Sequence, residues 1–145
     1  MGDGSGEDGR GLINCIKDNK LEKYFEFYNN FIPYNEYFEI ILNCDIIMPL
    51  IHPCVLNYEK YKATKVSAAF NMAYSFIKPL LLYEDFAKHD EFKEFAIFYS
   101  FDNLGDILTA PEFISKIEKV KLKIINNKKF NINMQRQNLI NFLRG

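Results

Sequence analysis

The sequence lacks several features that would place a protein in a familiar class. Lysine and arginine number 18 against 19 aspartates and glutamates, so the formal net charge is -1. Binding nucleic acid through bulk charge needs a net basic face, so we expect no nucleic-acid partner. No apolar run approaches the roughly 20 residues that span a bilayer. The acidic, glycine-rich start, MGDGSGEDGRG, has the pattern of neither a signal peptide nor a transit peptide.

Cysteine and histidine are also scarce. The three cysteines cannot all pair with one another, and each lies within or beside an apolar segment, so we expect reduced thiols in a cytoplasmic protein. A structural zinc site needs four ligands in close pairs, whereas Cys44, Cys54 and His52 are scattered, and we therefore expect no metal. The sequence contains neither a Gly-x-Ser-x-Gly elbow nor a Cys-His signature, so no catalytic residue is assigned.

What is present is a globular composition, with 48% hydrophobic and 26% charged residues over 145 positions. Short apolar runs predict strands at 25–28, 46–51, 79–83 and 94–99. Apolar residues at helical spacing predict helices at 12–20, 34–42, 66–77, 103–108, 111–127 and 133–145. Strands that alternate with amphipathic helices favour an α/β fold, a Rossmann-like parallel sheet flanked by helices in three α/β/α layers. We expect residues 12–145 to form this single domain, preceded by a glycine-rich loop or linker at 1–11.

Ligands bind beyond the carboxyl ends of the strands in such sheets. The glycine-rich start, the loop after Ile51 and the loop after Tyr83 are the candidate positions. The glycine-rich start offers a backbone cradle for a phosphate before the helix at Leu12, although a linker explains it as well. His52 is expected to contact a ligand at a strand end or to pack within its loop. His89 lies among charged residues and is expected at the surface.

A basic segment, from Lys60 to Ser67, comes just before a predicted helix. A helix N-terminus presents free N–H groups and the positive end of its dipole, and nearby lysines and a hydroxyl would complete a site for a diphosphate. Tyr58, just before this segment, and Tyr61 within it could stack on a base or sugar, or could pack. The alternative is a solvated loop in which Thr64 or Ser67 caps the helix. The predicted donor-binding residues are Lys65, Ser67, Thr64, His52, Tyr58, Tyr61, Lys62 and Gly4.

Several motifs occur in an order that resembles the carboxyl-terminal half of glycosyltransferases built from two Rossmann-like domains, the GT-B type. In that family a Gly-x-Gly loop leads to a helix, a strand and a second helix that ends at "a-D-i-x-l-x-P". The matching positions here are Gly2 and Gly4, 25–28, 34–42 and 44–49. FNMAYSFIKPLLL parallels the family's "l-E-a-m-a-x-G-k-P-v-i", and AIFYSFDNLGDIL parallels its "g-l-l-f-x-x-x-d-x-x-x-L-a-x-x-i". Met72 replaces the family's acidic residue, which often holds the donor ribose, and Ile77 replaces its glycine.

The resemblance implies a donor-binding half of a glycosyltransferase in cell-surface glycan or polysaccharide biosynthesis. The donor substrate would be a nucleotide-diphosphate sugar, and no further cofactor is implied. The family's acceptor domain would precede residue 1, so we expect no transfer by this chain alone. The location implied is cytoplasmic, with peripheral association at the inner face of the membrane as an alternative. A different class, a non-catalytic α/β binding or protein-interaction domain, also stays open.

A missing N-terminal half would leave a sheet edge and aromatic side chains uncovered. Phe25, Phe27, Tyr28 and Phe31 belong to the segment most affected. Because proteins avoid exposing such edges and apolar patches, we expect the chain to self-associate through this region.

Overall fold

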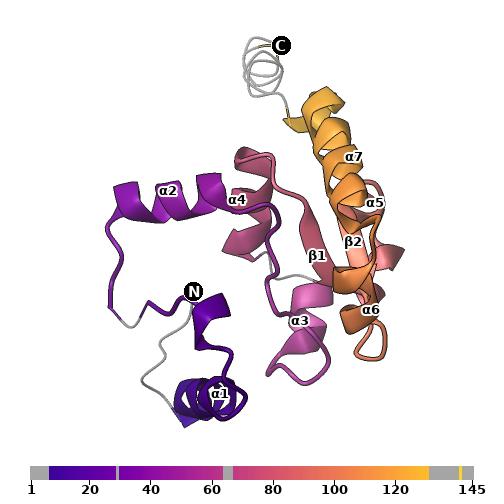
Figure 1. The fold of residues 1–145 in the computed structure, drawn as a ribbon. Helices are drawn as coiled ribbons and strands as arrows, with labels where there is room; N and C mark the ends of the chain where they lie inside the picture. The colour runs from indigo at the N-terminus through magenta and orange to yellow at the C-terminus, as the bar shows by residue number, and fades with distance from the viewer. Residues whose placement is uncertain (1–6, 29, 64–66, 131–140, 142–145) are drawn as a thin grey trace. The chain divides into compact units, whose positions relative to one another are not determined.

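The computed structural model describes residues 7–28, 30–63, 67–130 and 141 (Figure 1). The chain divides into two compact units, Met1–Leu42 and Asn43–Gly145. The boundary between the two units falls inside residues 12–145. The assignment of these residues to a single domain stays a prediction.

The N-terminal unit is built from short helices. It contains α1 (Glu7–Asp18), the 3-10 helix η1 (Glu22–Tyr24) and most of α2 (Tyr34–Asn43). The predicted helices at 12–20 and 34–42 are thereby confirmed. The former begins five residues earlier than predicted, so residues 7–11 are helical, and the linker role of residues 1–11 stays a prediction. Glycine costs about 1 kcal/mol in a helix interior, and the apolar spacing around Ile16, which is buried, outweighs this cost.

The predicted strand at 25–28 is wrong. Phe25 has an extended backbone, and its ring stacks on that of Phe27 at 6.1 Å, as alternate residues of a strand do. Among the described residues, however, no neighbouring strand pairs with this segment, and both rings are substantially exposed. An extended segment becomes a strand only when its backbone groups find partners across a ladder.

Parallel strand pairing occurs in the C-terminal unit. Strand β1 (Leu80–Tyr83) pairs with β2 (Ala96–Tyr99) in parallel, with Leu80 opposite Ala96. Both strands are predicted from their apolar runs and are confirmed. On the other side of β1, Ile47 forms a single parallel bridge to Leu80. The Ile47 N–H donates to Pro79 O at 2.9 Å, and its carbonyl accepts from Leu81 N at 2.9 Å.

The predicted strand at 46–51 is thus reduced to one bridge. Pro49 has no N–H to donate to a ladder. Leu50 has a φ of 54°, in the left-handed region that strands exclude. These two consecutive residues end the pairing that Ile47 begins.

Helices make up most of the remaining C-terminal unit. They are α3 (Tyr58–Ala63), α4 (Ala68–Ser75), η2 (Glu84–Lys88), α5 (Asp90–Lys93), α6 (Leu104–Thr109), α7 (Phe113–Asn126) and η3 (Lys128–Phe130). The predicted helices at 66–77, 103–108 and 111–127 correspond to α4, α6 and α7. Helix α3 lies between the loop after Ile51 and the start of α4, where no helix is predicted. The predicted helix at 133–145 lies outside the described residues, apart from Asn141.

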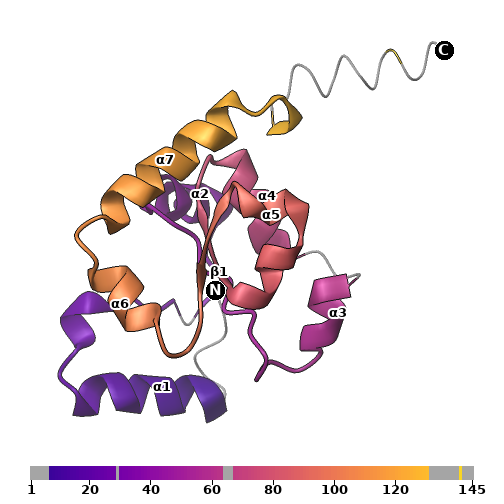
Figure 2. The ribbon, with the colours of Figure 1, turned by 90° about the vertical axis from the view of Figure 1, so that its right-hand side faces the viewer.

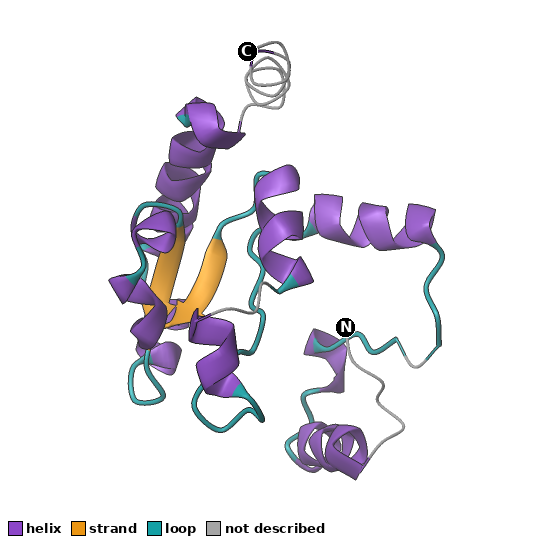
Figure 3. Ribbon diagram, turned by 180° about the vertical axis from the view of Figure 1, so that it is seen from behind, coloured by secondary structure: helices purple, strands orange, loops and turns teal. Residues whose placement is uncertain are grey.

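The core of this unit lies against both strands. Leu80, Leu82 and Ala96 pack in one buried cluster with Phe70 and Ala73 of α4. Helix α7 contacts β2 from the other side, so α4 and α7 flank the strands (Figures 1 and 2). Figure 3 shows the two strands among these helices from behind. The fold is therefore mixed α/β with parallel pairing, and the described residues do not form the broad Rossmann-like sheet that is predicted.

Helix α4 ends in a Schellman motif, a turn that satisfies its last carbonyl groups. Lys78 N donates to Ala73 O at 2.7 Å, and Ile77 N donates to Tyr74 O at 3.3 Å. Ile77 occupies the left-handed position of the motif, with a φ of 55°. Glycine is usual at this position because a side chain, above all a β-branched one, strains the left-handed backbone.

We expect Ile77→Gly to stabilise the C-terminal unit by roughly 0.5–1 kcal/mol, because relief of the left-handed strain exceeds the entropy cost of glycine. Urea unfolding followed by circular dichroism measures the change. Ile114→Gly is the matched control, since Ile114 lies exposed in α7 and the same replacement there should destabilise by up to about 1 kcal/mol. Equal losses of stability in the two variants would contradict the strain at Ile77.

Candidate functional site

Aromatic rings from two loops, strand β1 and helix α3 meet at the carboxyl ends of the strand segments. The His52 ring, after Ile51, lies edge-on to Phe101, with centroids 5.3 Å apart. Phe101 follows β2, and its ring lies 5.1 Å from that of Tyr83 at the end of β1. The ring of Tyr83 in turn lies edge-on to that of Tyr58 of α3, with centroids 6.4 Å apart. The loops after Ile51 and Tyr83, both predicted as ligand-binding positions, are thus connected by a continuous row of rings.

Tyr58 also belongs to a charge network around Asp85, in η2. The Tyr58 hydroxyl donates to Asp85 Oδ2 at 3.0 Å, and Lys62 Nζ lies 3.5 Å from the same oxygen. Lys88 Nζ lies 3.6 Å from Oδ1. Burial alone would raise the pKa of Asp85, but the Tyr58 hydrogen bond and the two cations outweigh it and lower the pKa. Asp85 is therefore an ionised carboxylate at neutral pH.

A cavity of about 300 Å³ adjoins this network. The end of α3 contributes Tyr61 and Lys62, and α4 contributes Phe70 and Asn71 from its amino-terminal half. The remaining lining residues are Ala63, Tyr74, Phe86, His89, Glu91 and Phe92. The cavity therefore connects two of the predicted donor-binding residues to the start of α4, with aromatic walls and the cationic end of a lysine.

Ser67 is the N-cap of α4, and its Oγ accepts from Ala69 N at 3.3 Å. This confirms the structural alternative for Ser67, in which its hydroxyl satisfies a backbone group of the helix. A hydroxyl used in this way is less available to a ligand. Lys65, Thr64 and Gly4 lie outside the described residues, and their roles in binding stay predictions.

The remaining predicted residues have partners within the fold. Tyr58 is buried in the core cluster, and Tyr61 packs against that cluster. His52 Nδ1 accepts from Cys54 N at 3.3 Å. The pKa of Tyr58 is raised, first by burial and then by the hydrogen bond to Asp85. Tyr58 is therefore engaged in packing, whereas Tyr61 and Lys62 line the cavity. His52 belongs to the ring row.

Sequence reasoning missed Asp85, Tyr83 and Phe101, and it placed His89 at the surface. His89 is instead half-buried, with its ring 6.2 Å from that of Phe86. Asp85 lies in η2, which directly follows β1. A usable signal was present, since Asp85 and Phe101 each stand two residues after the end of a correctly predicted strand.

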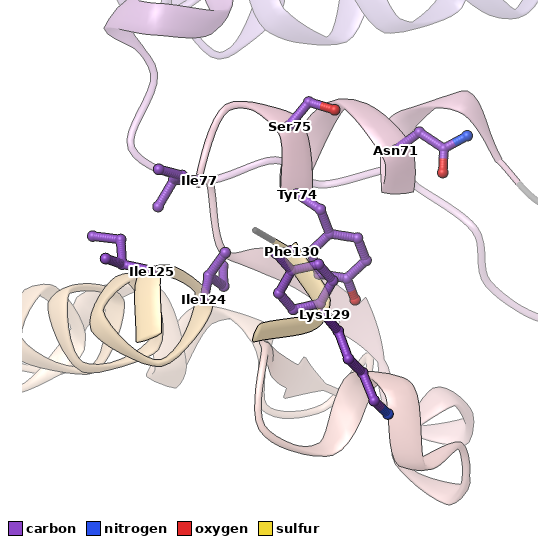
Figure 4. Close-up of a pocket in the computed structure, with 8 residues that line it drawn as sticks. All are labelled: Asn71, Tyr74, Ser75, Ile77, Ile124, Ile125, Lys129 and Phe130. Atoms are coloured by element: carbon purple, nitrogen blue, oxygen red, sulfur yellow. The ribbon is translucent and has the colours of Figure 1, made fainter. Parts of the chain in front are cut away.

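A larger cleft, of about 740 Å³, lies between α4 and the end of α7 (Figure 4). Its residues are Asn71, Tyr74, Ser75, Ile77, Ile124, Ile125, Lys129 and Phe130. The rings of Tyr74 and Phe130 are stacked at 4.4 Å and form part of its wall. Ile77 lies three residues before β1, so this mostly apolar cleft is at the amino end of the strand, opposite to the edge where α/β proteins bind ligands.

The sequence predicts neither a metal site nor a membrane-spanning segment. Within residues 7–28, 30–63, 67–130 and 141, no three His, Cys, Asp or Glu side chains gather as a metal site would require. The absence of a metal stays a prediction. None of the described helices combines the length and apolar composition needed to cross a membrane.

No protein family, curated protein or solved structure was found to match this chain. The ring row, the Asp85 network and the adjoining cavity therefore carry the functional interpretation. Lys62 belongs both to the Asp85 network and to the cavity lining, and Tyr58 links that network to the ring row. Aromatic surfaces beside a lysine suit an anionic ligand with a planar group.

Proposed function

We propose that the chain is the nucleotide-sugar-binding part of a GT-B type glycosyltransferase, within a larger Rossmann-like α/β/α arrangement. The observation that carries the proposal is the backbone of Ile77. The family's motif has glycine at this position, and here an isoleucine adopts the left-handed conformation that glycine favours. The motif-like segment also runs from α4 into β1, a helix followed by a strand, as the family's pattern requires.

The proposed donor site lies around the start of α4. The positive end of the helix dipole there would attract the diphosphate, with Lys65 and Lys62 as cations. Such groups stabilise the negative charge that develops on the departing nucleoside diphosphate, without a metal. The base or sugar would lie against the ring row that includes His52 and Phe101. The general base for the acceptor hydroxyl would come from the acceptor domain.

Thermal melting with uridine or guanosine diphosphate tests this function. A nucleotide that binds the native state stabilises it by mass action, by about 5–10 °C for a chain of this size at a hundredfold excess over Kd. Lys65→Ala should weaken binding by roughly 1.5–3 kcal/mol, the scale of a charged hydrogen bond. Lys119→Ala is the matched control, because it removes the same charge from an exposed position on α7.

Three results would count against this proposal. Absence of a melting shift with both nucleotides would refute donor binding by the chain. Equal affinity of wild type and Lys65→Ala would refute the assignment of Lys65. Equal weakening by Lys119→Ala would show that net charge, and no particular lysine, determines the affinity.

A second candidate function, a protein-interaction domain, is favoured by apolar side chains on the surface of α7. Ile114, Leu122 and Ile125 are all more than half exposed, and their spacing places them along one side of the helix. Light scattering on the melting samples distinguishes the two functions. Self-association at micromolar concentration without a nucleotide shift would favour the interaction domain, and the reverse result would favour donor binding.

A further inference from the structure

Lys62 is held by two carboxylates in the described structure. Its Nζ lies 2.9 Å from Glu59 Oε1 and 3.5 Å from Asp85 Oδ2. The Lys62 side chain retains 24% of its exposure, so solvent and small anions can still reach it. The positive charge of Lys62 therefore lies at the cavity, but the Glu59 and Asp85 carboxylates largely compensate it.

Asp85 is the less exposed of the two carboxylates. Its side chain is 29% exposed, against 80% for Glu59, and the buried Tyr58 hydroxyl holds it in place. Lys62 lines the same cavity as Phe70 and Asn71 at the start of α4. An anion bound there would thus compete directly with Asp85 for the Lys62 ammonium.

We propose that Asp85 is a positioning residue that sets the affinity of this site for diphosphates. In the absence of a ligand it holds Lys62 beside the cavity, and on binding it gives up part of that interaction to the incoming phosphate oxygens. Asp85 thereby keeps a cation preorganised and limits the strength with which that cation binds the anion. This inference rests on the proposed function, because it presumes a diphosphate at the start of α4.

Asp85→Asn separates this role from a purely structural one. The asparagine oxygen can still accept the Tyr58 hydrogen bond, whereas the competing negative charge is lost. We expect titration calorimetry with uridine diphosphate and inorganic pyrophosphate to show about three- to tenfold tighter binding, the scale of one charge at a partly solvated site. Damage to the fold alone would weaken binding, so a gain in affinity is specific to the proposed role.

Asp85 acts on binding through Lys62, and a double-mutant cycle tests this dependence. In the Lys62→Gln background, Asp85→Asn should change the affinity by less than about twofold. Glu59→Gln, at an exposed position that should not disturb folding, should tighten binding by about twofold by releasing the same lysine. Glu118→Gln on α7 is the control for net charge and should leave the affinity unchanged, since Glu118 does not line the cavity.

The outcomes distinguish failure of this inference from failure of the proposed function. If wild type binds neither ligand, both are overturned. If wild type binds but neither Asp85→Asn nor Glu59→Gln tightens binding, the inference alone is overturned. It is equally overturned if Asp85→Asn tightens binding to the same degree without Lys62, or if Glu118→Gln has the same effect. Tighter binding that requires Lys62 supports the inference.

Discussion

Replacing Phe86 with alanine is expected to lower the free energy of unfolding of the C-terminal unit by about 3–5 kcal/mol. Phe86 is only 1% exposed. Its ring lies edge-on to those of Phe70, Tyr58 and Phe92, at 5.9, 6.2 and 5.7 Å. Removing this ring creates a void where α3, α4 and α5 converge. Urea unfolding followed by circular dichroism gives the free energy, and hydrogen exchange of the β1 amides reports the same unit locally.

Phe101→Ala is the matched control for this large effect. Phe101 is 54% exposed, so its loss should cost less than about 1.5 kcal/mol, which corresponds to its two aromatic contacts. If donor binding uses the ring row, the same variant should weaken nucleotide binding while leaving the fold intact. Equal destabilisation by Phe86→Ala and Phe101→Ala would contradict the core assigned to the C-terminal unit.

The second large effect is expected at Ile124 of α7. Ile124→Ala should destabilise the C-terminal unit by about 2–5 kcal/mol, because the side chain is only 1% exposed and its loss leaves a cavity. The adjacent Ile125 is 55% exposed, and Ile125→Ala should change stability by no more than about 0.5 kcal/mol. Figure 4 shows both side chains beside the cleft. Denaturant midpoints of the two variants make the comparison directly.

The variants Ile124→Ala and Ile125→Ala together test which face of α7 is buried. Ile117, Phe113 and Ile124 recur at helical spacing and form its buried face. A similar loss of stability from Ile124→Ala and Ile125→Ala would mean that the exposed side is also covered, which would support the interaction-domain alternative. A large difference would place Ile125 on a free surface of the unit.

Local sequence patterns correctly predicted elements whose own residues carry the signal for their structure. The runs LLLY and AIFY correctly predicted β1 and β2, because continuous apolar residues suit a strand that is buried on both faces. The apolar spacing in 111–127 correctly predicted α7. A helix forms its hydrogen bonds within itself, so its pattern can be recognised without knowledge of any partner.

Other patterns were misleading because they needed a partner elsewhere in the chain. FEFY at 25–28 has a strand-like composition, but a strand also requires a neighbour for its backbone groups. The run at 46–51 has such a neighbour in β1, yet Pro49 and the left-handed backbone of Leu50 reduce it to a bridge. Helix α3 was missed because its short polar sequence resembles a loop and its packing comes mainly from Tyr58 in the core.

The sequence by itself determined β1, β2, the helices α4, α6 and α7, and the basic segment ahead of α4. Only the tertiary structure decided how that segment is used. Tyr58 and Asp85 are separated by 27 positions, yet their hydrogen bond positions the carboxylate that holds Lys62. The structure likewise revealed that Ile77 takes a left-handed backbone. Helical periodicity can be recognised from the spacing of nearby residues. The partner of a charged side chain depends on the fold of the whole chain, which no local pattern specifies.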